Sequence, residues 1–176
     1  MGNAVFSYPY QEIALVGIML FYPFMDRGWH YVHIKYRRDN LAFYFLLFIS
    51  LVIFLLSGST TIHFVVFNLL LAAVPEEWFF RAYFQSRLQK YIENNCRGTI
   101  WLAAVLSIVI SSFLFAVVHA VMQGNVLLLP LIFIPSLMFG YIYFKSKDIV
   151  LVILVHLLSN VIFDGLMLGK LLDGLI

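Results

Sequence analysis

The stretch that decides the fold is residues 62–88, IHFVVFNLLLAAVPEEWFFRAYFQSRL. Its first half is mostly apolar, and its second half carries Glu76, Glu77 and Arg81 among apolar neighbours. The stretch exceeds the roughly 20 residues that a helix needs to cross the hydrocarbon core of a bilayer. It lacks the alternation of apolar and polar residues that is typical of a membrane strand. It therefore predicts a membrane-spanning helix with ionisable side chains inside it.

The composition of the whole chain agrees with a membrane protein. Of 176 residues, 63% are hydrophobic and 11% are charged, and the mean hydropathy is +0.96. Soluble domains have roughly 45–50% apolar and about 25% charged residues, and a soluble fold of this size could not bury so much apolar surface. We expect an all-α, polytopic transmembrane helical bundle of about six spans, which forms one integral-membrane domain over residues 1–176. The five other apolar runs are residues 13–25, 41–57, 99–121, 126–144 and 149–168.

The basic residues predict how the bundle is oriented. Nine of the eleven Lys and Arg residues fall in the loops 26–40, 87–98 and 145–148. These loops share one side of the membrane if every run crosses it, and the positive-inside rule makes that side cytoplasmic. We expect an integral protein of a prokaryotic cytoplasmic membrane, whose basic loops contact anionic membrane lipid. The net charge of +2 gives no indication of a nucleic-acid partner.

Charged side chains in the middle of a membrane are costly, at roughly 2.5–3.5 kcal/mol each on insertion scales. Glu77 and Arg81 are four residues apart, so they can pair on one face of a helix. Glu76 points about 100° away and is not neutralised by that pair. A carboxyl group in such surroundings is a candidate general base or acid. The alternative is a solvated helix end at the cytoplasmic surface, because Arg87 and Lys90 follow soon after.

Three polar residues in later apolar runs accompany this cluster. His119 lies near the end of the run 99–121, where a lone histidine is usually a polar anchor. His156 and Asn160 are four residues apart in the last run, so both project from one face. Hydrogen bonding between helices is one explanation of that face. Because polar groups occur on three separate runs, a shared polar cavity is the better interpretation.

These residue types suffice for hydrolysis of a peptide bond. A carboxylate and a histidine can hold and deprotonate a water molecule, and a second histidine and an asparagine amide can donate to an oxyanion. Alternatively, Glu76, His119 and His156 could be the three ligands of a catalytic zinc ion, although no HExxH motif supports this. We expect no other cofactor. Serine chemistry is less attractive, because no serine lies in a GxSxG motif.

The motifs resemble those of a known family. Glu-Glu-x-x-x-Arg at residues 76–81, Phe-x-x-x-His at residues 115–119 and His-x-x-x-Asn at residues 156–160 are similar to the three motifs of the CPBP family. That family includes CAAX prenyl endopeptidases and bacteriocin-processing or immunity-type membrane proteins. The resemblance covers roughly residues 62–164, which we take as the catalytic core, and the stretch 139–144 also looks like the penultimate helix of the family.

The resemblance implies a glutamate-dependent intramembrane endopeptidase that acts on a membrane-associated or lipidated protein or peptide. Glu76 and His119 would activate the water, and His156 and Asn160 would form the oxyanion site. Supporting roles would fall to Glu77, Arg81 and Phe115. Two other functions fit the same polar cluster: a non-enzymatic membrane scaffold or immunity protein, and a proton or ion carrier.

The positions of Glu76 and His119 present a difficulty for this site. On straight helices, Glu76 lies about 14 residues, or ~21 Å, from the outer end of its run. His119 lies within about two residues of the outer end of the next run. Straight helices with these boundaries predict that the two side chains lie at different depths in the membrane. A re-entrant turn at residues 122–125, or a shift of the helix at Pro75, would remove the mismatch.

Overall fold

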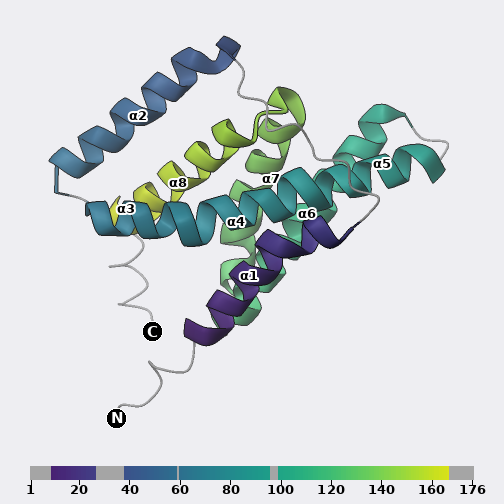
Figure 1. The fold of residues 1–176 in the computed structure, drawn as a ribbon, viewed down its shortest axis with the longest axis horizontal. Coiled ribbons are helices and arrows are strands. Elements are labelled where there is room, and N and C mark those ends of the chain that lie inside the picture. The colour runs from purple at the N-terminus through teal and green to yellow at the C-terminus, as the bar shows by residue number, and fades with distance from the viewer. Residues whose placement is uncertain (1–8, 27–37, 59, 96–98, 167–176) are drawn as a thin grey trace.

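A computed structural model describes residues 9–26, 38–58, 60–95 and 99–166 of the chain. Within these residues every regular element is a helix (Figure 1), as the sequence predicted. Three helices are long and apolar enough to cross a membrane: Ile62–Asn95, Ile100–Met122 and Leu128–Ser146. Three shorter apolar stretches accompany them: Ile13–Met25, Leu41–Leu56 and Ile149–Phe163. The protein is thus an all-α integral membrane bundle built from the six predicted runs.

The central element is one continuous helix from Ile62 to Asn95. It consists of α3 (Ile62–Asn68), the π-helical turn η2 (Leu69–Ala73), α4 (Val74–Glu77), the π-helical stretch η3 (Trp78–Gln85) and α5 (Ser86–Asn95). At 1.5 Å per residue, its 34 residues extend for about 51 Å, which exceeds the roughly 30 Å of the hydrocarbon core. The polar α5 therefore belongs at or beyond the membrane surface.

The π-helical turns of this helix have identifiable causes, of which the first is local. Pro75 has no N–H, and its ring clashes with the carbonyl of the residue four positions earlier. The turn before it is widened, so that the Val74 N–H donates to the Leu69 carbonyl five residues back. In the second stretch, hydroxyl groups bind carbonyls of the widened backbone: Ser111 Oγ donates to the Phe80 carbonyl at 2.9 Å, and Ser86 Oγ donates to the Arg81 carbonyl at 3.2 Å. These bonds stabilise the irregular helix where ionisable residues are concentrated.

Two antiparallel helices, α6 (Ile100–Met122) and α7 (Leu128–Ser146), pack against the central helix. The buried face of α6 consists mostly of small and polar residues, with Ile108 and Phe115 among them, and most of its large apolar residues point outward. This is the pattern of a helix that packs closely against helices on one side and meets lipid on the other. The buried residues include Ala103, Ala104, Ser107, Ser111, Ser112 and Ala116, and the exposed ones include Trp101, Leu102, Val105, Val109, Ile110 and Phe113.

The remaining helices lie around this centre (Figure 1). The helix α1 (Pro9–Met25) packs against α4 and η3, and it contributes Met19 to an apolar cluster with Phe80 and Phe115. The helix α8 (Ile149–Leu166) packs against α7, the central helix and α2 (Leu41–Leu56). None of the residues of α2 is buried, so this helix lies at the edge of the bundle.

The buried carboxylate of Asp148 fastens α2 to the turn between α7 and α8. It accepts hydrogen bonds from Asn40 Nδ2 at 2.8 Å and from the Tyr44 hydroxyl, and it caps the start of α8 through the Leu151 N–H. The preceding residue, Lys147, has a left-handed backbone with φ of 52°. The short turn between two apolar helices is thus held by one buried acid.

Contacts at one end of the bundle connect parts of the three basic loops to neighbouring elements. Arg87 forms an ion pair with Asp26 at 3.0 Å. The ammonium group of Lys145 lies 4.5 Å from the ring centroid of Trp101, at the start of α6. Much of the loop 26–40 and residues 96–98 of the second loop lie outside the described residues. The described parts agree with the prediction that the basic segments share one side.

Candidate active site

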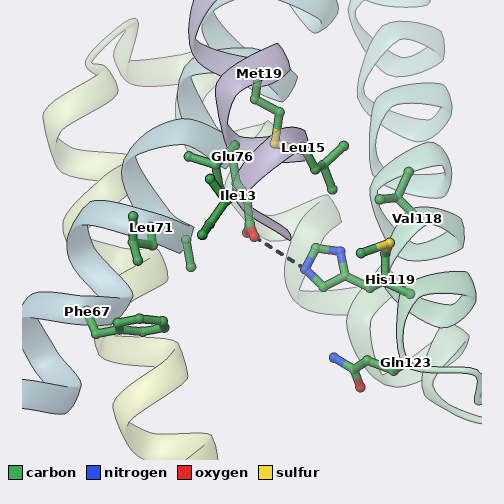
Figure 2. Close-up of a pocket in the computed structure, with 12 residues that line it drawn as sticks. Ile13, Leu15, Met19, Phe67, Leu71, Glu76, Val118, His119 and Gln123 are labelled. Atoms are coloured by element: carbon green, nitrogen blue, oxygen red, sulfur yellow. Dashed lines mark ion pairs between the residues drawn. The ribbon is translucent and has the colours of Figure 1, made fainter. Parts of the chain in front are cut away.

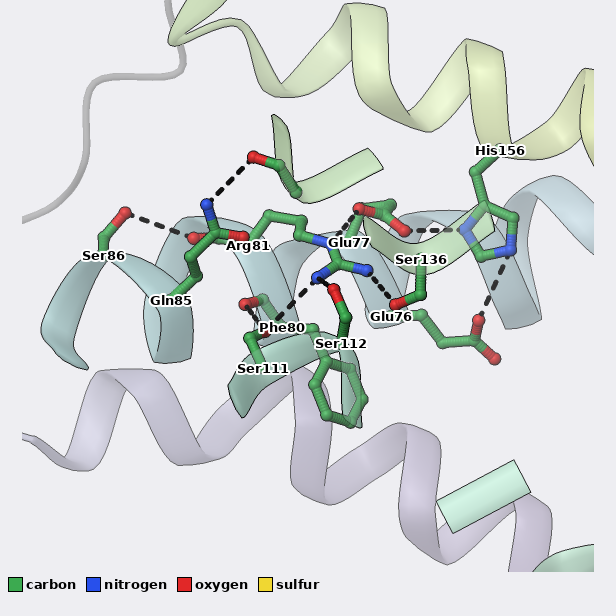
Figure 3. A network of polar contacts seen from close by, with 11 residues as sticks. Glu76, Glu77, Phe80, Arg81, Gln85, Ser86, Ser111, Ser112, Ser136 and His156 are labelled. Atoms are coloured by element: carbon green, nitrogen blue, oxygen red, sulfur yellow. Dashed lines mark hydrogen bonds and ion pairs between the residues drawn. The ribbon is translucent and has the colours of Figure 1, made fainter. Parts of the chain in front are cut away.

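Glu77 and Arg81 form the predicted ion pair, and it is fully buried. Arg81 Nε lies 3.1 Å from Glu77 Oε2, and both side chains have an exposed fraction of 0%. Arg81 is bound further by Ser111 and Ser112 of α6, at 3.3 and 3.4 Å from Nη1, and by Ser136 of α7, at 2.6 Å from Nη2 (Figure 3). A buried charge pair is tolerated when hydrogen bonds satisfy its remaining polar atoms. Arg81 therefore connects three helices while it neutralises Glu77.

His156 of α8 contacts both glutamates. Its Nδ1 lies 2.8 Å from Glu77 Oε1, and its Nε2 lies 3.7 Å from Glu76 Oε2 (Figure 3). The ring also stacks on Phe139 of α7, with 4.8 Å between the ring centroids and 23° between the planes. Because an ionised carboxylate can only accept, Nδ1 carries a proton in the bond to Glu77. The orientation of the imidazole is thereby fixed, with Nε2 directed at Glu76.

His119 of α6 faces Glu76 from the opposite helix (Figure 2). Its Nε2 lies 3.5 Å from Glu76 Oε1, and its Nδ1 lies 2.9 Å from the carbonyl oxygen of Phe115, one turn earlier. A carbonyl oxygen only accepts, so Nδ1 carries the proton and Nε2 faces the carboxylate. The Phe115 ring lies against the imidazole, with 4.3 Å between their centroids. Phe115 therefore supports His119 through both its backbone and its side chain.

The prediction that Glu76 and His119 lie at different depths is wrong. That prediction compared how many residues separate each side chain from the outer end of its run, and the outer ends of the two runs do not lie at the same level. The central helix ends at Asn95 and α6 begins at Ile100, so the two helices form a hairpin. Glu76 lies 19 residues before the end of the first helix, and His119 lies 19 residues after the start of the second. Counted from their shared turn, the two residues are at the same height.

Asn160 lies one turn after His156 on α8 and lines the same cavity as the three residues above. Its Nδ2 donates to Asn68 Oδ1 at 3.3 Å. The cavity has a volume of about 310 Å³. Each of the four residues predicted to be catalytic thus reaches one cavity, in which Glu76 contacts both histidines.

A second cavity, of about 370 Å³, reaches Glu76 and His119 from the side of α1. Its walls are apolar and come from α1, from the start of the central helix and from α6, as Figure 2 shows. Glu76 and His119 line both cavities, together with Ala72 and Gln123. The carboxylate therefore lies between an apolar space and a more polar one.

No group of three or more His, Cys, Asp or Glu side chains among the described residues has the arrangement of a metal site. Among the candidate ligands, Glu76 Oε1 lies 3.5 Å from His119 Nε2, and Glu76 Oε2 lies 3.7 Å from His156 Nε2. Nδ1 of His119 is bound by the Phe115 carbonyl, and Nδ1 of His156 is bound by Glu77. Such a bond is found in histidines that bind a metal through Nε2 and also in histidines that bind none, so it does not distinguish the two cases. The zinc hypothesis for these three residues stays a prediction.

The comparison with protein families decides the relationship. The profile described as "Type II CAAX prenyl endopeptidase Rce1-like" matches residues 58–162, more than half of the chain. The chain belongs to this Rce1-like family. The match agrees with the resemblance that the three motifs indicated and includes each of the four candidate catalytic residues. No curated protein and no solved structure matches the chain.

Several polar residues around the Rce1-like site were not predicted. Asn68 and Ser136 contact Asn160 and Arg81, and Gln85 Nε2 donates to the Gly140 carbonyl at 3.0 Å. The signal that could have identified them is their polarity within apolar runs, where polar side chains are usually buried and paired. The two serines of α6, Ser111 and Ser112, bind Arg81.

Proposed function

We propose that this chain is an intramembrane endopeptidase in which Glu76 and His119 activate a water molecule. The observation that supports this most directly is the position of the Glu76 carboxylate, which faces Nε2 of His119 at 3.5 Å and Nε2 of His156 at 3.7 Å. These separations are long for a direct hydrogen bond and suit groups that share a bound water. Both histidines are anchored through Nδ1, so each offers only Nε2 to the reaction.

The proton transfers follow from these positions. Glu76 accepts a proton from the water as its oxygen attacks the carbonyl carbon of the scissile peptide bond. Neutral His119 presents the lone pair of Nε2 and accepts a hydrogen bond from the same water. The tetrahedral intermediate then collapses, the carbon–nitrogen bond breaks, and Glu76 returns the proton to the departing amine nitrogen. The products are a carboxylic acid and an amine, and no covalent enzyme intermediate forms.

The oxyanion of the intermediate is assigned to His156 and Asn160. Donation from Nε2 of His156 requires an imidazole that is protonated on both nitrogens, and Glu77 accepts from the other nitrogen at 2.8 Å. The amide of Asn160 supplies a second N–H from the same cavity. Fixed donors directed at a developing negative charge are usually the largest single contribution to such catalysis.

The substrate we propose is a membrane-associated or lipidated protein or peptide. The cavity between α1 and the central helix is apolar and opens on Glu76, so it suits an apolar part of such a substrate. The Rce1-like family is described as prenyl endopeptidases that act on CAAX sequences, and a farnesylated CAAX peptide is therefore the first substrate to test. We further propose that the basic end of the bundle faces the cytoplasm.

A zinc ion, if bound, would be held by Glu76, His119 and His156, and would supply Lewis-acid polarisation and a more acidic water. The mechanism proposed above assigns each proton to a residue of the chain and uses no metal. The two versions differ in their response to a chelator.

The test of the function is cleavage by the purified protein in lipid nanodiscs. The protein is incubated with a farnesylated CAAX peptide and with a set of membrane-anchored leader peptides, and products are identified by mass spectrometry. The proposal expects a single cut in at least one of these substrates. Proton flux driven by a pH gradient in liposomes, with no cleavage of any peptide, would instead indicate a proton carrier. The absence of both flux and cleavage would indicate a non-enzymatic scaffold.

A further inference from the structure

The amide of Asn160 is oriented by a second amide, that of Asn68. Asn68 Nδ2 donates to the Phe64 carbonyl at 3.1 Å, and Asn68 Oδ1 accepts from Asn160 Nδ2 at 3.3 Å. An amide side chain has one donor end and one acceptor end. Because the donor end of Asn68 is bound to its own helix, the acceptor end must point at Asn160. These two hydrogen bonds together determine that the nitrogen end of the Asn160 amide faces Asn68.

The π-helical turn explains why Asn68 can reach the site. In a regular α-helix, residues eight positions apart are offset by about 80° around the axis. Between Asn68 and Glu76 lies η2, whose wider turn takes up one additional residue. The two side chains are then related roughly as residues seven positions apart, with an offset of about 20°. Asn68 and Glu76 accordingly line one cavity, together with Asn160.

We propose that Asn68 is a positioning residue that holds the Asn160 amide with one N–H group available to the oxyanion. This inference rests on the proposed function. The Asn160 nitrogen carries two hydrogens, and one is taken by Asn68. The other is left for the cavity. Without Asn68 the amide can rotate and present its oxygen, which repels an oxyanion, in place of its nitrogen.

A merely structural role makes a different prediction. If Asn68 only ties α3 to α8, its replacement lowers stability and leaves the turnover of folded protein unchanged. Asn68→Leu separates the two roles, because leucine has a similar size and packs well in a membrane helix but has no polar end. Ser50→Ala is the matched control, since it removes a side-chain hydrogen bond from the exposed face of α2, where Ser50 Oγ donates to the Leu46 carbonyl.

The experiment measures kcat and KM of the folded, nanodisc-embedded variants with a substrate that the wild-type protein cleaves. For Asn68→Leu we expect kcat about tenfold lower with KM within about twofold of wild type, and for Ser50→Ala neither changes. Asn160→Ala should lower kcat by about 10²–10³, as removal of an oxyanion donor does. The kcat of the double variant should lie within about twofold of the kcat of Asn160→Ala, because Asn68 acts through Asn160.

If the wild-type protein cleaves its substrate, two outcomes would overturn the inference about Asn68 and leave the proposed function intact. One is a kcat of Asn68→Leu within about twofold of wild type. The other is a further tenfold loss when the two substitutions are combined. Should Asn68→Leu fail to insert, Asn68→Ala provides the same comparison with a smaller side chain. A wild-type protein that cleaves none of the peptides would overturn the proposed function, and this inference with it.

Discussion

Glu76 and His119 occupy matching positions on the two arms of a helical hairpin, 19 residues from its turn on either side, and Glu76 Oε1 lies 3.5 Å from His119 Nε2. Each residue comes from a different apolar run, so neither arm alone forms the site. The hairpin holds the carboxylate and the imidazole at one height within the bundle. Substitutions at either residue that leave the hairpin intact should therefore lower the cleavage rate without lowering the stability of the fold.

The buried pair of Glu77 and Arg81 should contribute far more to stability than the pair of Arg87 and Asp26. Arg81→Ala leaves Glu77 buried without its partner, which typically costs about 3–5 kcal/mol. Arg87→Ala is the matched control, because its side chain is 44% exposed and such pairs are worth about 0–1 kcal/mol. Thermal unfolding in detergent checks both. Equal destabilisation by the two substitutions would contradict the assigned burial.

Gly140 should not tolerate a methyl group. A Cβ at this position would lie 2.9 Å from Gln85 Oε1 and 3.1 Å from Ile108 Cγ2, so Gly140→Ala overpacks the contact of α7 with the central helix and with α6. We expect a loss of about 1–3 kcal/mol in the free energy of unfolding. Gly17→Ala, whose Cβ meets nothing within 4 Å, should be neutral or stabilising by up to about 1 kcal/mol. Reversal of this order would show that α7 packs elsewhere.

The predictive power of the sequence differed between the bundle and the site. Hydropathy located the helices, because lipid requires long apolar runs, and the spacing of Glu77 and Arg81 predicted their ion pair. The widened turns of the central helix could not be read from Pro75 alone, since the Phe80 carbonyl depends on Ser111 of another helix. The depth of His119 was misjudged because it depends on where the hairpin turns. Asn68 and Ser136 are single polar residues whose partners only the tertiary fold reveals.

Metal chelation tests the water-activation mechanism. With Glu76 and His119 as the groups that activate the water, dialysis against EDTA and 1,10-phenanthroline should leave the cleavage rate within about twofold of the untreated protein. Metal content measured by mass spectrometry on the dialysed sample confirms that removal was complete. Activity that disappears on dialysis and returns with added Zn²⁺ would contradict the metal-free mechanism and favour zinc on Glu76, His119 and His156.

The orientation in the membrane can be tested with single cysteines. Cys96 is the only cysteine of the chain, so a Cys96→Ser background permits one labelling site at a time. A cysteine in place of Lys147 should react with a membrane-impermeant maleimide only when the cytoplasmic face is accessible, as in inverted vesicles. A cysteine in place of Asn125, in the turn between α6 and α7, should react only in right-side-out cells. The opposite pattern would invert the topology.

The most direct test of the account is the cleavage rate of Glu76→Gln in nanodiscs, measured with the substrate that the wild-type protein cleaves. Glutamine keeps the size and hydrogen-bonding reach of the side chain but cannot accept the proton of the attacking water. We predict a decrease in kcat of at least about 10²-fold, in the range that general-base catalysis contributes, with thermal unfolding close to that of wild type. A folded Glu76→Gln protein that cleaves at the wild-type rate would contradict the account.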